Sequence, residues 1–142
     1  MKIQTILATK GTQVATVRAQ QPLKEALALL AQHNVGALVV VDEADKLVGI
    51  ISERDFARAA ARGEDIFTRP TSAVMTSRVV VATPQDDVAS VMKTMTEKRF
   101  RHLPVMENGK LVGIVSIGDM VKAQLDQYQG EIETLETQIT GG

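Results

Sequence analysis

The stretch Lys46-Leu47-Val48-Gly49-Ile50 occurs twice in this chain, because Lys110-Leu111-Val112-Gly113-Ile114 repeats it letter for letter. Each copy continues with one aliphatic residue, a serine, two variable positions and an aspartate; these polar residues are Ser52 and Asp55, and Ser116 and Asp119. Five consecutive identities with an aligned serine and aspartate indicate an internal duplication. A repeat of this kind determines the organisation of the whole chain.

The duplication extends upstream of both copies. Residues 35–41 align with residues 100–106, and the first copy has one additional residue in the polar turn between Val41 and Lys46. Apolar residues with helical spacing precede both aligned segments: Leu23, Ala26, Leu27 and Leu30 in the first copy, and Val88, Val91, Met92 and Met95 in the second.

Each copy is predicted to fold as β-α-β-β-α. The aliphatic runs 37–41 and 47–51 are expected strands, and Asn108-Gly109 between the second pair is a strong hairpin signal. β-branched stretches at 14–17 and 79–81 add a strand before each copy, and helices follow at 53–62 and from 117 onward. Thr83 as N-cap and Pro84 at the first helical position predict where the first helix of the second copy begins. A unit of about 50 residues is too small to be stable alone, so we expect two to pack face to face.

The composition argues against several classes of protein. The chain has 142 residues, two histidines and no cysteine, which excludes disulfides and thiolate chemistry and argues against a metal centre. Its net charge of −1 is unlike that of nucleic-acid-binding proteins, and no apolar run approaches the roughly 20 residues of a membrane span. Because the first residues do not resemble a signal peptide, the sequence predicts a cytoplasmic protein without nucleic-acid or membrane partners. No arrangement of catalytic residues is apparent, so we expect no enzymatic activity.

Two copies that each end in Gly-hydrophobic-x-Ser-x-x-Asp resemble tandem cystathionine-β-synthase (CBS) domains, the pair known as a Bateman module. His102-Leu103-Pro104-Val105 and Val74-Met75-Thr76 fit the same pattern, and the whole is similar to stand-alone bacterial CBS-pair proteins. The resemblance implies an α/β fold of two CBS repeats with pseudo-two-fold symmetry and a C-terminal helix. The expected segments are repeat 1 at 1–62, a connection at 63–78, repeat 2 at 79–122 and a helical tail at 123–142.

The resemblance also implies a non-catalytic sensor that binds an adenosine ligand between the repeats and signals through a conformational change. The implied ligand is AMP or another of ADP, ATP, NAD(H) and S-adenosylmethionine, with no further cofactor required. A carboxylate one turn inside a helix can accept both ribose hydroxyls, and the helix N-terminus suits phosphate. The nucleotide-binding residues implied by the resemblance are Ala37, Ser52, Arg54, Asp55, Arg101, His102, Pro104, Ser116 and Asp119.

These residues also have purely structural interpretations. Ser-x-x-Asp is a capping box as well as a ligand motif, and Arg54 is either a phosphate partner or a solvated surface residue. The basic run at 98–102 has no counterpart in the first copy. This difference predicts that one cleft binds a phosphorylated ligand better than the other.

An apolar stripe follows the second repeat. Its members are spaced by 4, 3, 4, 3 and 4 residues, which is coiled-coil spacing: Val121, Leu125, Tyr128, Ile132, Leu135 and Ile139. The stripe packs either on its own module or on a second copy of the chain, and Gly130 weakens the middle of this helix. Since Bateman modules also pair into discs, we expect a homodimer.

The expected function is energy or redox sensing that controls another protein. The alternative is a dimeric interaction scaffold that binds no physiological nucleotide and whose clefts are vestigial. The two hypotheses differ in whether a nucleotide stabilises the protein.

Overall fold

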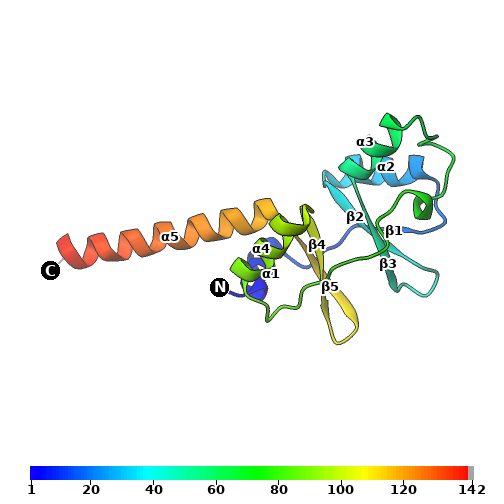
Figure 1. Ribbon diagram of the computed structural model, residues 1–142. Helices are drawn as coiled ribbons and strands as arrows, with labels where there is room; N and C mark the ends of the chain where they lie inside the picture. Colours follow the sequence, from blue (N-terminus) through cyan, green and yellow to red (C-terminus); the bar gives the residue numbers. More distant parts are fainter. Residues whose placement is uncertain (141–142) are drawn as a thin grey trace.

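The computed structural model describes residues 1–140 and contains two small sheets with helices packed around them (Figure 1). The first half forms a three-stranded sheet in the order β1-β2-β3, in which β1 is parallel to β2 and β2 is antiparallel to β3. Its elements are β1 (Thr16–Arg18), α2 (Leu23–His33), β2 (Ala37–Val41), β3 (Leu47–Ser52) and α3 (Glu53–Ala61).

The second half repeats this arrangement with a smaller sheet. Its antiparallel strands are joined through Asn108 and Gly109, both at positive φ, which confirms the predicted hairpin turn. Its elements are α4 (Val88–Lys98), β4 (His102–Glu107), β5 (Lys110–Ser116) and α5 (Ile117–Thr140). A helix at the start of the chain, α1 (Ile3–Lys10), and a short 3-10 helix, η1 (Thr71–Ala73), complete the fold.

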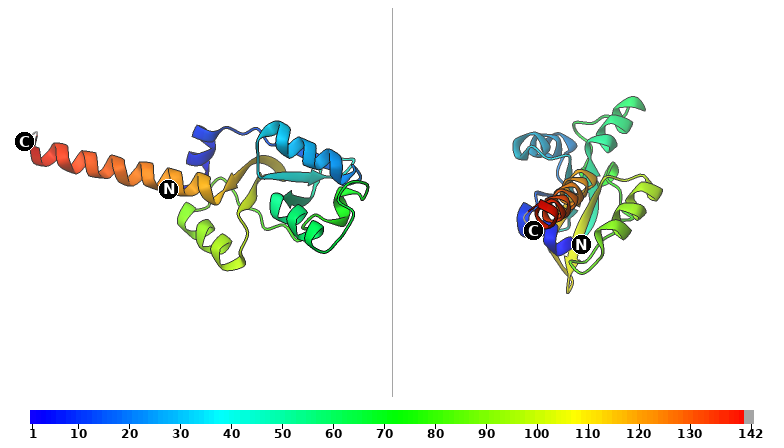
Figure 2. Two further views of the ribbon diagram at one scale, coloured as in Figure 1. Left: turned by 90° about the horizontal axis from the view of Figure 1, so that it is seen from above. Right: turned by 90° about the vertical axis from the view of Figure 1, so that its left-hand side faces the viewer.

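Two apolar cores confirm the predicted α/β fold of paired repeats. Leu23, Leu38, Ile51 and Phe56 are among the buried residues of the first core. Met95, Leu103, Val115 and Met120 belong to the second. The views of Figure 2 show the two groups of elements packed beside each other, with α5 extending away from both.

The segment before each repeat packs on the opposite repeat. Ile3, Ile6 and Leu7 of α1 are buried in the second core, whereas Val74 and Met75, which lead into the second repeat, pack on the first. The repeated glycines make room for this exchange. A Cβ on Gly113 would lie 2.6 Å from Leu7 Cδ2, and one on Gly49 would lie 2.5 Å from Met75 Sδ.

The predicted strand at 79–81 is wrong. Only Ala82 pairs with β4, through a bridge to Val105, whereas the first repeat forms a three-residue strand at the same place. In the first repeat the N–H of Val39 donates to the carbonyl of Ala15. The second repeat has Pro104 at the position equivalent to Val39. Proline has no N–H to donate, so the second sheet cannot form this hydrogen bond.

The predicted start of the following helix at Thr83 is also wrong. Helix α4 begins at Val88, with the Asp87 carboxylate accepting from the Ser90 N–H at 3.1 Å. Residues 83–86 form a turn whose carbonyls at Pro84 and Asp86 accept from the free N–H groups at the start of α1. Because this tertiary contact satisfies donors that a helix N-terminus leaves free, it outweighs the local N-cap signal.

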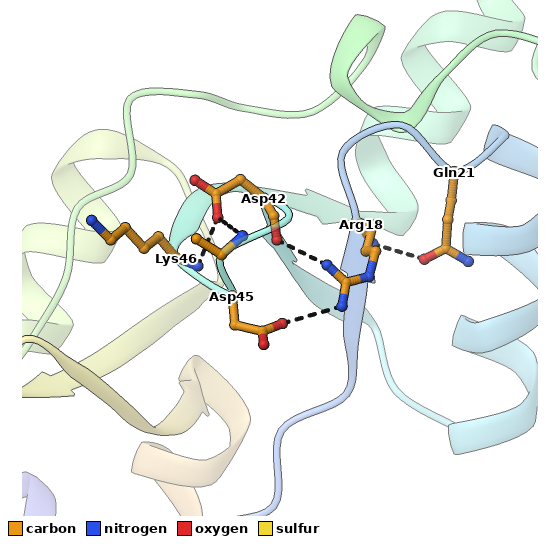
Figure 3. A network of polar contacts seen from close by, with 6 residues as sticks. Arg18, Gln21, Asp42, Asp45 and Lys46 are labelled. Carbon is orange, nitrogen blue, oxygen red and sulfur yellow. Dashed lines mark hydrogen bonds and ion pairs between the residues drawn. The ribbon is translucent and has the colours of Figure 1, made fainter.

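Two aspartates, Asp42 and Asp45, and Arg18 hold the turn between β2 and β3 (Figure 3). Asp42 accepts from the N–H groups of Ala44 and Lys46, which accommodates the additional residue of this copy. Arg18 at the end of β1 donates to the Asp42 carbonyl at 3.1 Å and approaches Asp45 at 3.5 Å. These contacts hold the outer strand of the first sheet against the turn.

Helix α5 continues without interruption through Gly130. No helix within residues 1–140 combines the length and the apolar character needed to cross a membrane. Residues 141 and 142 of the expected tail lie outside the described part of the chain.

Candidate functional site

A cleft of about 230 Å³ lies where the first repeat meets the second. It opens at the corner where β3 leads into α3, as the sequence suggested. The lining also includes residues 99–101 between α4 and β4, His102 at the start of β4, and residues of the segment after η1. Its lining residues are Gly36, Ile50, Ser52, Glu53, Arg54, Asp55, Arg58, Thr76, Arg78, Val79, Val80, Arg99, Phe100, Arg101 and His102.

The corner itself is held by a capping box. The Asp55 carboxylate accepts from the Ser52 N–H at 2.9 Å and from the Ser52 hydroxyl at 3.2 Å. The N–H of Glu53 donates to the carbonyl of Gly36, so one of the free helix N–H groups expected to suit phosphate is already used. The structural interpretation of Ser-x-x-Asp is therefore confirmed, and a contact with a ligand stays a prediction.

The cleft carries an excess of positive charge. Five arginines line it, at positions 54, 58, 78, 99 and 101, against the two carboxylates of Glu53 and Asp55. Arg54 also donates to the Arg99 carbonyl at 3.5 Å, which connects the two repeats across the cleft. Such a concentration of guanidinium groups attracts anions and favours phosphate, whose oxygens match the planar arginine fork.

His102 is partly buried between the cleft and the second repeat. Its ring lies so close to Gly36 that a Cβ on that glycine would be 3.0 Å from Nε2. Burial lowers the pKa of His102, and Lys10 lowers it further, while Asp119 and Glu53 oppose this effect. The ring is therefore predominantly neutral at pH 7 and can both donate and accept a hydrogen bond.

The second strand-to-helix corner is occupied by a side chain of α1. The Lys10 ammonium lies 2.5 Å from Asp119 Oδ2 and donates to the Ile114 carbonyl at 2.8 Å. Ser116 and Asp119 form their own capping box, with bonds of 2.9 and 3.0 Å. Burial by itself would raise the pKa of Asp119, but the bonds from Lys10 and Ser116 outweigh it and lower the pKa.

The two corners therefore differ in what their aspartates contact. Within residues 1–140, Asp55 forms no ion pair, whereas Asp119 is paired with Lys10. Arg78 and Lys10 hold equivalent places, each three residues after the side chain that packs on a repeated glycine. Arg78 lines the cleft of Asp55, while Lys10 binds the carboxylate of its own corner.

Five of the nine expected binding residues meet in one cleft, namely Ser52, Arg54, Asp55, Arg101 and His102. Asp119 lines a different groove of about 670 Å³ between α1 and α5, and its cap partner Ser116 lines neither. Ala37 and Pro104 are buried within their strands, although Gly36, next to Ala37, borders the cleft.

Sequence reasoning missed three arginines of the cleft. Arg58 follows Arg54 by one helical turn, so the helical repeat of α3 was a sufficient signal for it. Arg99 belongs to the basic run that the sequence singled out, but which of its members face the cleft depends on the backbone at the end of α4. Arg78 lies in the connecting segment, where no local sequence pattern indicates which way a side chain points.

The CBS domain family profile matches residues 7–62 and 72–126, which together form both repeats. The chain is a tandem CBS-domain protein. It is 40% identical over 118 residues to the CBS domain-containing protein YhcV of Bacillus subtilis, covering 82% of this chain and 83% of YhcV. It is 38% identical over 123 residues to the mitochondrial CBS domain-containing protein CBSX3 of Arabidopsis thaliana. That match covers 83% of this CBS pair but only 60% of CBSX3.

Solved structures of CBS-domain proteins have the same fold. The CBS-domain containing protein ATU1752 of Agrobacterium tumefaciens is 40% identical, with a TM-score of 0.82 over 87% of this chain and 92% of its own. The CBS domain protein PAE2072 of Pyrobaculum aerophilum, solved in complex with AMP, is 26% identical with a TM-score of 0.75 over 84% and 89% of the two chains. The CBS domain pair of protein MJ0100, solved with 5-methylthioadenosine and S-adenosyl-L-methionine, is 28% identical with a TM-score of 0.80 over 89% and 98%.

Proposed function

We propose that this CBS pair is a non-catalytic regulatory protein that binds one adenine nucleotide per chain in the arginine-lined cleft. The observation that carries the proposal is the meeting of Asp55 with five arginines in one cleft between the repeats. The AMP complex of PAE2072 and the adenosyl ligands of MJ0100 support an adenosine ligand. Cytoplasmic location and dimerisation through the CBS disc stay predictions.

The charge of the cleft favours a ligand with more than one phosphate. Its five arginines exceed its two carboxylates by three positive charges, and ADP or ATP neutralises this excess more completely than AMP does. The cleft volume of about 230 Å³ is below the usual range of enclosed ligand pockets, so adenosine would fill it. The phosphates would then lie at the open rim, where Arg54, Arg58, Arg78, Arg99 and Arg101 are available.

Asp55 is proposed to hold the ribose. Its carboxylate is half-buried, is fixed in direction by Ser52 and forms no ion pair with another described residue. Asp119 is proposed not to take this role in the resting protein, because Lys10 already occupies its carboxylate. This difference supports one strong site per chain rather than two equal ones.

The test is calorimetric titration with AMP, ADP, ATP and NADH. We expect one site per chain, with ATP and ADP binding more tightly than AMP. A hydrogen bond to a charged group contributes at least about 1.5 kcal/mol, so Arg58→Gln should weaken ATP binding about 10-fold or more. Arg62→Gln, four residues after Arg58 at the C-cap of α3 and outside the cleft, is the matched control and should change little.

A second pair of variants tests the sugar contact. Asp55→Asn should weaken all the nucleotides, while its amide oxygen still accepts from Ser52 and preserves the helix start. Asp119→Asn should leave nucleotide affinity unchanged. If none of the four nucleotides binds the wild-type protein, the proposal is refuted and the interaction scaffold, supported by the exposed apolar stripe of α5, takes its place.

A further inference from the structure

Helix α5 carries an apolar stripe that no other described element covers. Figures 1 and 2 show the helix leaving the two repeats and continuing as a single rod, away from both sheets. The CBS match ends at residue 126, so most of this rod lies outside the family fold. The stripe residues are exposed by 40 to 80%: Val121, Leu125, Tyr128, Ile132, Leu135 and Ile139.

A rod of this kind needs a partner. Isolated helices are marginally stable in water, and Gly130 in the middle of the rod is a weak helix former. A regular stripe of large apolar side chains along one face of a projecting helix is the pattern of a helix that packs on another helix.

The spacing of the stripe identifies its partner. The steps of 4, 3, 4, 3 and 4 residues are the same when read in either direction. A second copy of the helix, turned end to end, therefore presents an apolar side chain opposite every member of the stripe. In that register Val121 meets Ile139 of the second copy, Leu125 meets Leu135, and Tyr128 meets Ile132. We propose that α5 forms an antiparallel two-helix dimer centred on Gly130.

The charges on α5 favour this direction over the parallel one. Glu131, Glu133 and Glu136 lie in the second half of the helix, whereas the first half carries Asp119, Lys122 and Asp126 and is therefore less negative. A parallel dimer would place both acidic halves side by side, so six carboxylates would repel each other. The antiparallel dimer places each half with three glutamates opposite the less negative half of the other helix, which reduces this repulsion, and it sets the two helix dipoles in opposite directions.

The absence of cysteine makes disulfide cross-linking a clean test of direction. The double variant Leu125→Cys with Leu135→Cys should form covalent dimers under mild oxidation, because these positions face each other in the antiparallel register. Each single variant should remain uncross-linked, because its cysteine then faces a leucine. The control double variant Gln127→Cys with Thr134→Cys lies off the stripe and should not cross-link.

A mass measurement tests the stripe itself. Sedimentation equilibrium should show that Leu125→Glu with Leu135→Glu halves the mass of the assembly, while nucleotide affinity and the circular dichroism of the CBS module stay unchanged. Retained nucleotide binding separates a failure of this inference from a failure of the proposed function. Cross-linking of the single cysteine variants would establish a parallel dimer and overturn the proposal. An assembly mass that the glutamates do not change would overturn it as well.

Discussion

The repeated glycines provide the most direct test of how the two halves are joined. Gly113→Ala would introduce a Cβ 2.6 Å from Leu7 Cδ2 and 3.2 Å from Leu7 Cδ1. Ordinary carbon–carbon contacts begin near 3.5 Å, so Leu7 would have to move by about 1 Å although it is only 6% exposed. Overpacking of this kind costs roughly 1–3 kcal/mol.

Gly49→Ala should have the larger effect of the two. Its new Cβ would lie 2.5 Å from Met75 Sδ and also 3.0 Å from the Thr76 carbonyl oxygen, which is backbone and cannot change rotamer. That carbonyl accepts from the Ile50 N–H, and Thr76 lines the arginine cleft. We therefore expect Gly49→Ala to lose stability at the upper end of the range and to weaken nucleotide binding as well.

The assay is urea unfolding followed by circular dichroism. Gly130→Ala is the matched control, because nothing lies within 4 Å of its new Cβ and alanine is the better helix former. It should raise the free energy of unfolding by up to about 1 kcal/mol. Leu7→Ala combined with Gly113→Ala should cost less than the sum of the single variants, because the added methyl group fills part of the space that Leu7 leaves. Additive costs, or a neutral Gly113→Ala, would show that α1 does not pack on the second repeat.

Two further predictions concern groups that titrate. Because burial lowers the pKa of His102, the unfolded chain binds its proton first as the pH falls. Stability should therefore decrease below about pH 6.5 and continue to decrease down to the lowered pKa of the folded state. Between pH 7 and pH 5 the Tm of His102→Gln should fall less than the Tm of wild type, whereas the Tm of the control His33→Gln should fall as much as that of wild type. Equal falls of Tm in all three proteins would contradict the prediction. Lys10→Met should raise the pKa of Asp119 in a carboxyl NMR titration, because the ammonium that lowers it is removed. The pKa of Asp65, which Thr68 and Phe67 lower by hydrogen bonds, serves as the unaffected reference, and an unmoved Asp119 titration would mean that Lys10 does not pair with it in solution.

Where the sequence prediction failed, a distant contact changed the local outcome. Thr83 and Pro84 carry a good helix-start signal, yet the carbonyls around them bond to α1, and the helix begins at Val88 instead. The strand expected at 79–81 is reduced to one bridge because Pro104, on another strand, cannot donate the hydrogen bond that would extend it. The proline that limits the strand lies more than 20 residues further along the chain. The N–H groups of α1 that displace the helix start lie about 80 residues earlier.

The sequence by itself determined the duplication, the β-α-β-β-α order of the first repeat, the α-β-β-α order of the second, the Asn108-Gly109 hairpin and the two capped corners. These features depend on side-chain periodicity and on hydrogen bonds within a few residues, so a local pattern contains all the information they need. Only the tertiary structure decided that α1 packs on the second repeat and that Lys10 binds Asp119, whereas Asp55 forms no ion pair within the described residues 1–140. It alone also brought Arg78 and Arg99 to the cleft that Arg54 and Arg58 line, because the direction of a surface side chain is set by how whole elements pack against each other.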